Sequence, residues 1–444
     1  MKSEVGVITH RDHLLIVCYA YPPFKSIGSI RNYYFTKELS KCVASTDLLS
    51  TSNINVVGTI EGDLSHICDK KYLPTIDYTF FKEYFGKRKN SKTGTIQSKK
   101  IIVEIKHTTT FLEKLTNSFP FNILFYGGIF YLIFGIIHGL RRSKKNSVIY
   151  SSFIPYVDHV IAYIIKLCKP NTFWIADFRD FQTFPHEEKL IFPRFQHWIN
   201  RKIFSKADIV TNVTAAIADY NSKYNAKSIC ITNGVPIDFI SVNKSEKVAN
   251  SFFSIVYTGM LYKGKRNAES VFTAVKELID EKRIDSGAIK LIYAGSEGSY
   301  WDTWATKTNL NSCTINYGVL PHERAVELQQ NASINLAMNW VIKESLGAFG
   351  GKFFEYLLSE VPILMLLSGE KDSEIERANE EINFGIVTYD FEADNVRFIK
   401  QFILEHYLYW TENKTCKRII NKDGLQKYQW ENIMAPLKKI IFNM

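Results

Sequence analysis

Short apolar runs alternate with segments of helical periodicity through the first half of the chain. The apolar runs have the length of buried strands and lie at 13–21, 53–59, 147–150, 173–176, 207–212 and 228–232. Helical patterns separate several of them, at 157–167, 195–205 and 214–224. Buried strands that alternate with helices are typical of parallel α/β sheets. We therefore predict a Rossmann-like domain over residues 1–242.

The second half repeats this alternation after a polar linker at about 240–250. Strand patterns lie at 252–259, 288–296, 314–318, 334–338, 363–367 and 386–389, and helical patterns at 269–279, 322–331, 391–410 and 424–443. A length of 444 residues fits two domains. We predict a second Rossmann-like domain over 243–420, and a C-terminal helix within 421–444 that packs back on the first domain.

Residues 121–140 contain no Asp, Glu, Lys or Arg and are followed at once by the basic sequence RRSKK. Their length reaches the threshold for a membrane span. A span would separate the two halves, although both supply parts of one predicted site. We therefore favour a helix that lies in the membrane interface or dips into one leaflet. A wholly buried helix is the alternative.

The net charge of +10 is compatible with nucleic acid, an anionic membrane surface or phosphorylated substrates as partners. Basic residues do not interleave with aromatic residues as in nucleic-acid modules, so we expect no nucleic-acid partner. The basic stretch 81–100 is expected to be a solvated loop, with a lipid-facing patch as the alternative. Seven scattered cysteines without a C-x-x-C pair indicate a reducing compartment, and the N-terminal sequence has no signal-peptide pattern.

A glycine-rich loop runs into an apolar helix at 347–361. Glycines at 347, 350 and 351 allow backbone amides to approach an anion, and the helix start adds its positive end. Lys352 adds a charge, and Glu355 lies about one turn further along, where it can accept hydrogen bonds from a sugar ring. This pattern predicts a nucleotide-sugar site. The alternative is a glycine turn that caps a core helix, with Glu355 solvated.

The first half offers a second candidate site in DFRD, where a predicted strand ends. Ligands bind at the carboxyl ends of strands in open α/β sheets. Asp177, Arg179 and Asp180 are therefore acceptor-side candidates, and an Asp–Arg pair that only fixes the loop is the alternative. The first strand leads to a loop with Gly28 but lacks G-x-G-x-x-G, so no dinucleotide fingerprint is present.

Five segments, in order, carry a resemblance to a known family. They are YPPFKSIGSIR, KADIVTNVTAAIADYNSKY with ITNGV, VYTGMLYKGKR, YGVLPHERAVELQQNASINLAM and GAFGGKFFEYLLSEVPIL. Together they resemble the retaining glycosyltransferases of family four, of the type that builds bacterial surface polysaccharides. The resemblance implies the GT-B fold, which has two Rossmann-like domains with an interdomain cleft.

The sequence departs from this family at two motifs. The family signature has two glutamates, and Glu355 matches the second, whereas Gly347 stands in the place of the first. Phe349 and Gly350 keep their signature places. The basic loop begins with Gly259-Met260 instead of Gly-Arg, and the lysines and the arginine that follow can supply the charge.

The resemblance assigns roles to residues of this chain. Arg266 and Lys352 are expected to stabilise the leaving diphosphate, with Asp180 and Arg179 on the acceptor side of the reacting centre. The expected donor contacts are Glu355, Phe349, Gly350, Gly351, Lys263, Lys265, Gly259, Gly28 and Val319, and the expected acceptor contacts are Asp177, Ser29 and Arg31. The family needs no catalytic metal, and the sequence has no D-x-D between strands and no histidine cluster.

The expected activity is transfer of a sugar from a nucleotide-sugar donor to a saccharide acceptor, with retention of configuration. A lipid-linked acceptor at the cytoplasmic face of a membrane fits the basic charge and the apolar segment 121–140. The alternatives are a GT-B-type nucleotide-sugar epimerase or hydrolase, and a catalytically degenerate protein that binds a membrane surface.

Overall fold

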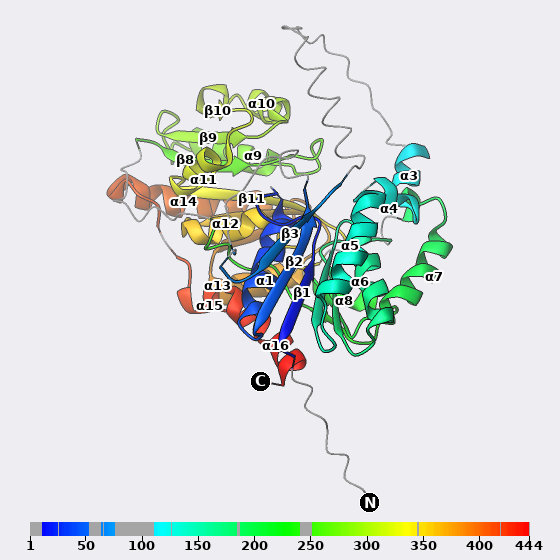
Figure 1. The fold of residues 1–444 in the computed structure, drawn as a ribbon. Helices are drawn as coiled ribbons and strands as arrows, with labels where there is room; N and C mark the ends of the chain where they lie inside the picture. Colours follow the sequence, from blue (N-terminus) through cyan, green and yellow to red (C-terminus); the bar gives the residue numbers. More distant parts are fainter. Residues whose placement is uncertain are drawn as a thin grey trace, which may run out of the picture. The chain divides into compact units, whose positions relative to one another are not determined.

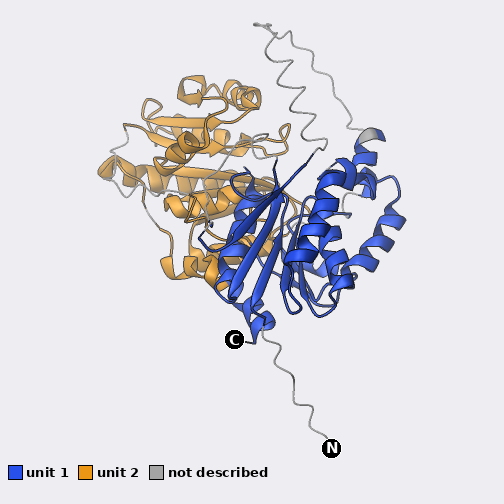
Figure 2. Ribbon diagram, in the orientation of Figure 1, with its two compact units in different colours: residues 1–232, 433–444 blue, residues 233–432 orange. Residues whose placement is uncertain are grey.

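The chain forms two compact units in a computed structural model. Unit 1 comprises residues 1–232 and 433–444, and unit 2 comprises residues 233–432 (Figure 2). The structure describes residues 11–24, 26–52, 64, 66–75, 111–125, 127–183, 187–239, 251–343, 346–417 and 419–443. Three predictions lie outside these residues: the strand 53–59, the basic stretch 81–100 and the linker 240–250.

Within the described residues, unit 1 contains a seven-stranded parallel sheet of order β3-β2-β1-β4-β5-β6-β7 (Figure 1). The strands are β1 His13–Val17, β2 Ser45–Thr51, β3 Asp69–Leu73, β4 Val148–Phe153, β5 Phe173–Phe178, β6 Ile209–Asn212 and β7 Ser228–Cys230. The helices are α1 Ile27–Ser40, α3 Phe111–Asn117, α4 Phe121–Phe125, α5 Gly128–Arg142, α6 Val157–Cys168, α7 Pro193–Phe204, α8 Ala215–Ser222 and, from residue 433, α16 Trp430–Phe442. Strands β1, β4 and β5 are buried along their whole length, which explains why they read as continuous rather than alternating apolar runs.

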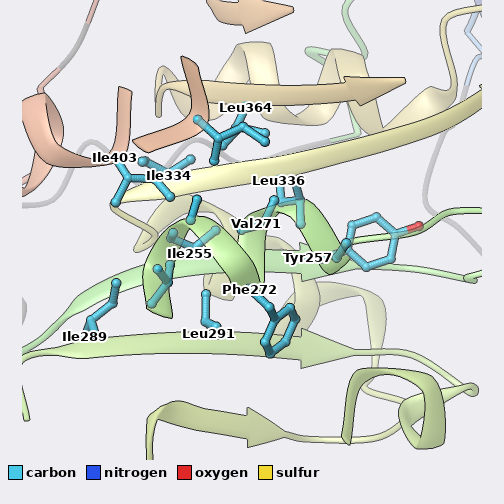
Figure 3. Packing of buried hydrophobic residues seen from close by; sticks show 14 of the residues in the cluster. Ile255, Tyr257, Val271, Phe272, Ile289, Leu291, Ile334, Leu336, Leu364 and Ile403 are labelled. Atoms are coloured by element: carbon cyan, nitrogen blue, oxygen red, sulfur yellow. The ribbon is translucent and has the colours of Figure 1, made fainter. Parts of the chain in front are cut away.

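Unit 2 contains, among its described residues, a six-stranded parallel sheet of order β10-β9-β8-β11-β12-β13. Its strands are β8 Phe253–Thr258, β9 Ile289–Ala294, β10 Thr314–Asn316, β11 Ile334–Val341, β12 Ile363–Gly369 and β13 Gly385–Tyr389. Its helices are α9 Glu269–Asp280, α10 Gly298–Lys307, α11 His322–Gln330, α12 Gly351–Ser359, α13 Ser373–Ile382, α14 Asn395–Asn413 and α15 Lys422–Gln426. Figure 3 shows Val271 and Phe272 of α9 packed with Ile255 of β8 and Leu291 of β9 in the core.

The predicted fold class is confirmed, because each unit is a Rossmann-like parallel α/β sheet. The units divide after residue 232 and not after the predicted 242, since the Val235 amide donates to the Tyr428 carbonyl within unit 2. The C-terminal segment is also shared. Helix α15 belongs to unit 2, whereas residues 433–444 belong to unit 1, where Lys438 Nζ lies 2.5 Å from Glu38 Oε2.

The apolar segment 121–140 forms two helices, α4 and α5, separated at Gly127 and Gly128. Both glycines have positive φ, 106° and 74°, which ends the first helix. Among the described residues, no helix is both long and apolar enough to cross a membrane. Helix α5 packs on α6 closely enough that a Cβ at Gly135 would crowd Ile161. Its opposite side is exposed, so the alternative of a wholly buried helix is wrong, while the favoured interfacial helix stays a prediction.

Candidate functional site

In unit 2, the loop after β8 meets the first turn of α12. Gly259 has φ 143°, a backbone conformation that favours glycine, and it lies so close to Lys352 Nζ that a side chain there would displace the lysine. Lys352 is an exposed residue as a whole. The protein atoms around its ammonium group nevertheless displace water and lower the pKa of Lys352. Glu355 opposes this shift and Arg266 adds to it. The structure thus brings Gly259, Lys352, Arg266 and Glu355 into one neighbourhood.

Arg266 is oriented by neutral partners. Its guanidinium donates to Asn339 Oδ1 at 3.3 Å and to the Tyr257 hydroxyl at 3.4 Å, and it lies 4.5 Å from the centroid of the Tyr262 ring. Among the described residues, no carboxylate forms an ion pair with Arg266 or Lys352. Two cations that form no ion pair with the described residues and lie beside a helix start can bind an anionic ligand.

Glu355 is held by helix α11. Its carboxylate lies 3.3 Å from His322 Nε2 and 3.3 Å from Gln329 Nε2, and its side chain is 15% exposed. The alternative in which Glu355 is solvated is therefore wrong. Sequence reasoning did not single out His322 or Gln329, although both lie in a segment that carried the family resemblance.

The glycine-rich loop is only in part the predicted anion cradle. The Gly347 amide donates to both oxygens of Asp372, at 2.9 and 3.1 Å, and the Phe349 amide donates to the Gly347 carbonyl. The Phe349 ring stacks on Phe353 at 4.8 Å and serves the core. No side chain caps α12 at Gly350, and the Phe353 amide donates to the Gly350 carbonyl, which leaves the amides of Gly351 and Lys352 without an intrahelical partner. Of the predicted anion-binding amides, only those at the start of α12 therefore remain available to a ligand.

The remaining donor-side predictions lie on neighbouring loops of unit 2. Lys265 Nζ lies 4.3 Å from the centroid of the half-exposed Trp340 ring. Lys263 lies in the loop between β8 and α9, and its amide donates to the Glu297 carboxylate. Val319 is exposed between β10 and α11.

In unit 1, Asp177 and Arg31 form a buried ion pair. Arg31 donates to the two Asp177 oxygens from Nε at 2.9 Å and from Nη2 at 2.7 Å, and the two side chains are 0–1% exposed. Burial raises the pKa of Asp177, but Arg31 and a hydrogen bond from Thr211 more than offset this effect, so the pKa lies below its usual value. Ser29 is also fully buried, with its Oγ 2.7 Å from Ser26 Oγ.

Arg31 and Asp177 therefore hold α1 to the sheet, while Ser29 bonds within the start of α1, and we do not retain the three as direct acceptor contacts. An Asp–Arg pair was the alternative for the DFRD sequence, but its arginine is Arg31 and not Arg179.

Arg179 is bound by backbone carbonyls. It donates from Nε to the Phe153 carbonyl at 2.6 Å and from Nη2 to the Ile154 carbonyl at 2.7 Å. Its guanidinium lies against Gly28, where any side chain would overlap it. Burial lowers the pKa of Arg179, and Asp177 opposes that shift. The structural reason for glycine at position 28 is therefore room for Arg179.

Asp180 borders a cavity of about 370 Å³ at the carboxyl ends of β4 and β5. The cavity is lined by Glu113, Asn117, Asn122, Phe153, Ile154, Pro155, Tyr156, Asp180, Phe181, Gln182, Lys189 and Leu190. Asn122 Oδ1 and Gln182 Oε1 are buried, and neither has a hydrogen-bond partner among the described residues. Buried polar atoms of this kind are normally paired with a ligand or water. The cavity has the mixture of aromatic and polar groups that a saccharide requires.

The described part of the chain contains no group of three His, Cys, Asp or Glu side chains that could hold a metal ion. Two candidate sites are thus present, a cationic surface on unit 2 and a polar cavity on unit 1.

No family model matches the chain, and no curated protein matches it in sequence. Several solved structures align with it over nearly their whole lengths. For sucrose-phosphate synthase from Thermosynechococcus elongatus the identity is 12%, the alignment covers 98% of this chain and 99% of the synthase, and the TM-score is 0.52. For WaaG, a glycosyltransferase involved in lipopolysaccharide biosynthesis, the identity is 12%, the coverages are 97% and 100%, and the TM-score is 0.51.

A structure of TarM from S. aureus also aligns, with 12% identity and a TM-score of 0.45, but this chain spans only 59% of the TarM chain. At these identities the likeness concerns the fold. The chain has the two-unit, parallel α/β organisation of GT-B glycosyltransferases.

Proposed function

We propose that this protein transfers a sugar from a nucleotide-sugar, bound on unit 2, to a saccharide acceptor bound on unit 1. The observation that carries the proposal is the convergence of Lys352, Arg266 and the uncapped start of α12 beside Glu355. Negative charge grows on the departing diphosphate in the transition state. Preorganised cations and amides aimed at that charge lower the barrier.

Glu355 orients the nucleoside. Because His322 and Gln329 fix its carboxylate, the remaining lone pairs of the oxygens can accept hydrogen bonds from ribose hydroxyls. The diphosphate then lies toward Lys352, one turn closer to the helix start. Retention of configuration and independence from metal are part of this proposal through the family resemblance.

The acceptor binds in the cavity of unit 1. Asp180 borders this cavity and can accept the proton that the attacking hydroxyl loses. The departing phosphate oxygen is the other base available for that proton.

A membrane supplies the acceptor. Helix α5 exposes an apolar stripe with helical spacing, consisting of Ile129, Phe130, Ile133, Phe134 and Ile137. The exposed basic residues Arg141, Lys144 and Lys145 follow the stripe. An apolar stripe beside cations favours the interface of an anionic bilayer. A peripheral location at the cytoplasmic face and a lipid-linked saccharide of surface polysaccharide synthesis are consistent with this surface.

Thermal unfolding of the full chain against a panel of nucleoside diphosphates and nucleotide-sugars tests the donor site. A ligand that binds only the native state adds about 2.7 kcal/mol of stability at one hundred times its Kd. We expect a shift with one base, loss of that shift in Glu355→Ala, and its retention in Glu327→Ala, which removes an exposed glutamate of α11. No shift with any nucleotide would favour a membrane-binding protein without activity.

Incubation with the nucleotide-sugar in the absence of acceptor separates the remaining enzymatic alternatives. Transfer requires the acceptor, so the donor should remain essentially intact. A new sugar isomer would indicate an epimerase, and rapid release of free sugar would indicate a hydrolase.

A further inference from the structure

The loop between β8 and α9 adopts a backbone conformation that its residues do not favour. Tyr262 and Lys263 have φ of 50° and 57°, in the left-handed region that residues other than glycine rarely occupy, and Gly264 follows with φ 82°. Two successive non-glycine residues in this region persist only where their surroundings hold them there. The same loop carries Lys265 and Arg266, so the conformation decides where those cations point.

One carboxylate holds this loop. Glu297 Oε2 accepts hydrogen bonds from the Leu261 amide at 2.6 Å and the Tyr262 amide at 2.8 Å, and Glu297 Oε1 accepts one from the Lys263 amide at 2.8 Å. Three successive amides that converge on one anion form a nest. Hydrogen bonds to a charged acceptor are about twice as strong as neutral ones. Both Glu297 oxygens are occupied by the loop.

The segment that carries Glu297 is itself fixed to the start of the loop. The Tyr293 hydroxyl donates to the Gly259 carbonyl at 2.9 Å and accepts from the Glu297 amide at 3.0 Å. Gly295 is so close that a side chain there would collide with the Gly259 carbonyl. The end of β9 therefore sets the position of the loop from residue 259 to residue 263.

The restraint extends to Arg266 through Leu261. The Arg266 amide donates to the Leu261 carbonyl at 3.1 Å, while the Leu261 amide donates to Glu297. The Arg266 guanidinium also rests on the ring of Tyr262. The amide of Tyr262 in turn donates a hydrogen bond to Glu297. A change in the nest thus moves both the backbone and the side-chain platform of Arg266.

We propose that Glu297 is the positioning residue for the donor diphosphate: by filling the three-amide nest at 261–263, it aims Arg266 at the phosphates without touching them. This inference rests on the proposed function, because it assigns the phosphates to the cations of this loop. The negative charge of Glu297 thus determines the affinity for the phosphates, although the phosphates are also negatively charged.

The variant Glu297→Gln separates this role from general stability. The amide keeps one acceptor oxygen but presents N–H groups to a neighbouring N–H donor, so the nest opens. We expect affinity for the nucleoside diphosphate to fall about tenfold or more. Affinity for the matching nucleoside should be unchanged, since its ribose contacts Glu355. Glu297→Asp, which keeps the charge, should restore part of the lost affinity.

Two measurements on the full chain decide the question. Calorimetric titrations with UDP, GDP, ADP and CDP and their nucleosides give the affinities, and hydrogen exchange of peptides that cover 259–266 reports on the nest. Glu281→Gln, which alters an exposed glutamate of the same unit, is the matched control. Faster loop exchange in Glu297→Gln alone, with a loss confined to the diphosphates, is the expected result.

Unchanged loop exchange in Glu297→Gln overturns the proposal, as does an equal loss of nucleoside and diphosphate binding. If the wild-type chain binds none of the eight ligands, the proposed function fails, and with it the role toward the diphosphate. The exchange measurement then still shows whether Glu297 holds the loop, so the two failures are distinguishable.

Discussion

Arg179 occupies the space that a side chain at Gly28 would need. We expect Gly28→Ala to destabilise the protein by about 1–3 kcal/mol through overpacking. In an Arg179→Ala background the clash is absent, and alanine favours helix α1, so the same substitution should be neutral or stabilising. Urea unfolding of the two single variants and the double variant gives this coupling energy. Additive effects would show that the guanidinium does not rest on Gly28.

A second residue-scale prediction concerns the ion pair of Arg31 and Asp177. Arg31→Ala leaves a carboxylate buried without its cation and should cost about 3–5 kcal/mol at neutral pH. The pKa of Asp177 lies below its usual value in the folded chain, so its stabilisation is present above about pH 4 and is lost as pH falls through the folded pKa. The difference between wild type and Arg31→Ala should therefore narrow below about pH 4. A difference that is constant with pH would contradict the pairing.

Helix α5 carries the exposed apolar stripe for which we propose membrane binding. The double change Ile133→Ser with Phe134→Ser removes two exposed apolar side chains of its stripe and should lower binding to anionic vesicles about tenfold or more. Thermal stability should fall less than in a variant of the core, because Ile133 and Phe134 remain 46% and 38% exposed in the folded chain. Co-sedimentation measures the binding, and Leu167→Ser with Leu408→Ser, two exposed leucines on other helices, is the control. Equal losses in both variants would mean that the stripe has no special role.

Most strands could be predicted from the sequence because both faces of a parallel sheet are buried, so they appear as apolar runs. Strands β2 and β3 were not predicted, because their sequences STDLLST and DKKYL are not apolar runs. The break in the segment 121–140 was harder to predict. Its apolar composition continues unbroken through Gly127 and Gly128, and only their positive φ values in the fold separate α4 from α5. Helix α12 and the place of Glu355 one turn into it were recognisable for a local reason, since glycines precede a short amphipathic pattern.

The partners of the site residues were not predictable in the same way. Glu297 meets the amides of 261–263 across 34–36 residues of sequence, and Arg31 meets Asp177 across 146. No local periodicity encodes such pairings, because they depend on which loops the sheet order brings together. The sequence therefore pointed to DFRD as a group of charged residues but not to Arg31 as the partner of Asp177.

At the scale of the whole molecule, unit 1 is discontinuous in sequence. Its last helix carries Met434, Leu437 and Ile441, which are fully buried, and Lys438 pairs with Glu38 across 400 residues. Leu437→Ala should destabilise unit 1 by about 2–5 kcal/mol. Hydrogen exchange should then rise in peptides from α1 but not in peptides from β8 and β9 of unit 2. Increased exchange confined to unit 2 would show that the residue serves the other core.

This discontinuity has a consequence for synthesis of the chain. A ribosome adds about 5–20 residues per second, so roughly 10–40 s separate residue 232 from the completion of residues 233–432. During that interval the nascent unit 1 lacks the strip formed by Met434, Leu437 and Ile441, and the apolar surface that receives this strip stays open. Unit 2, although translated later, is the first to have its whole sequence available for folding. Unit 1 reaches its final packing only when the last helix has left the exit tunnel.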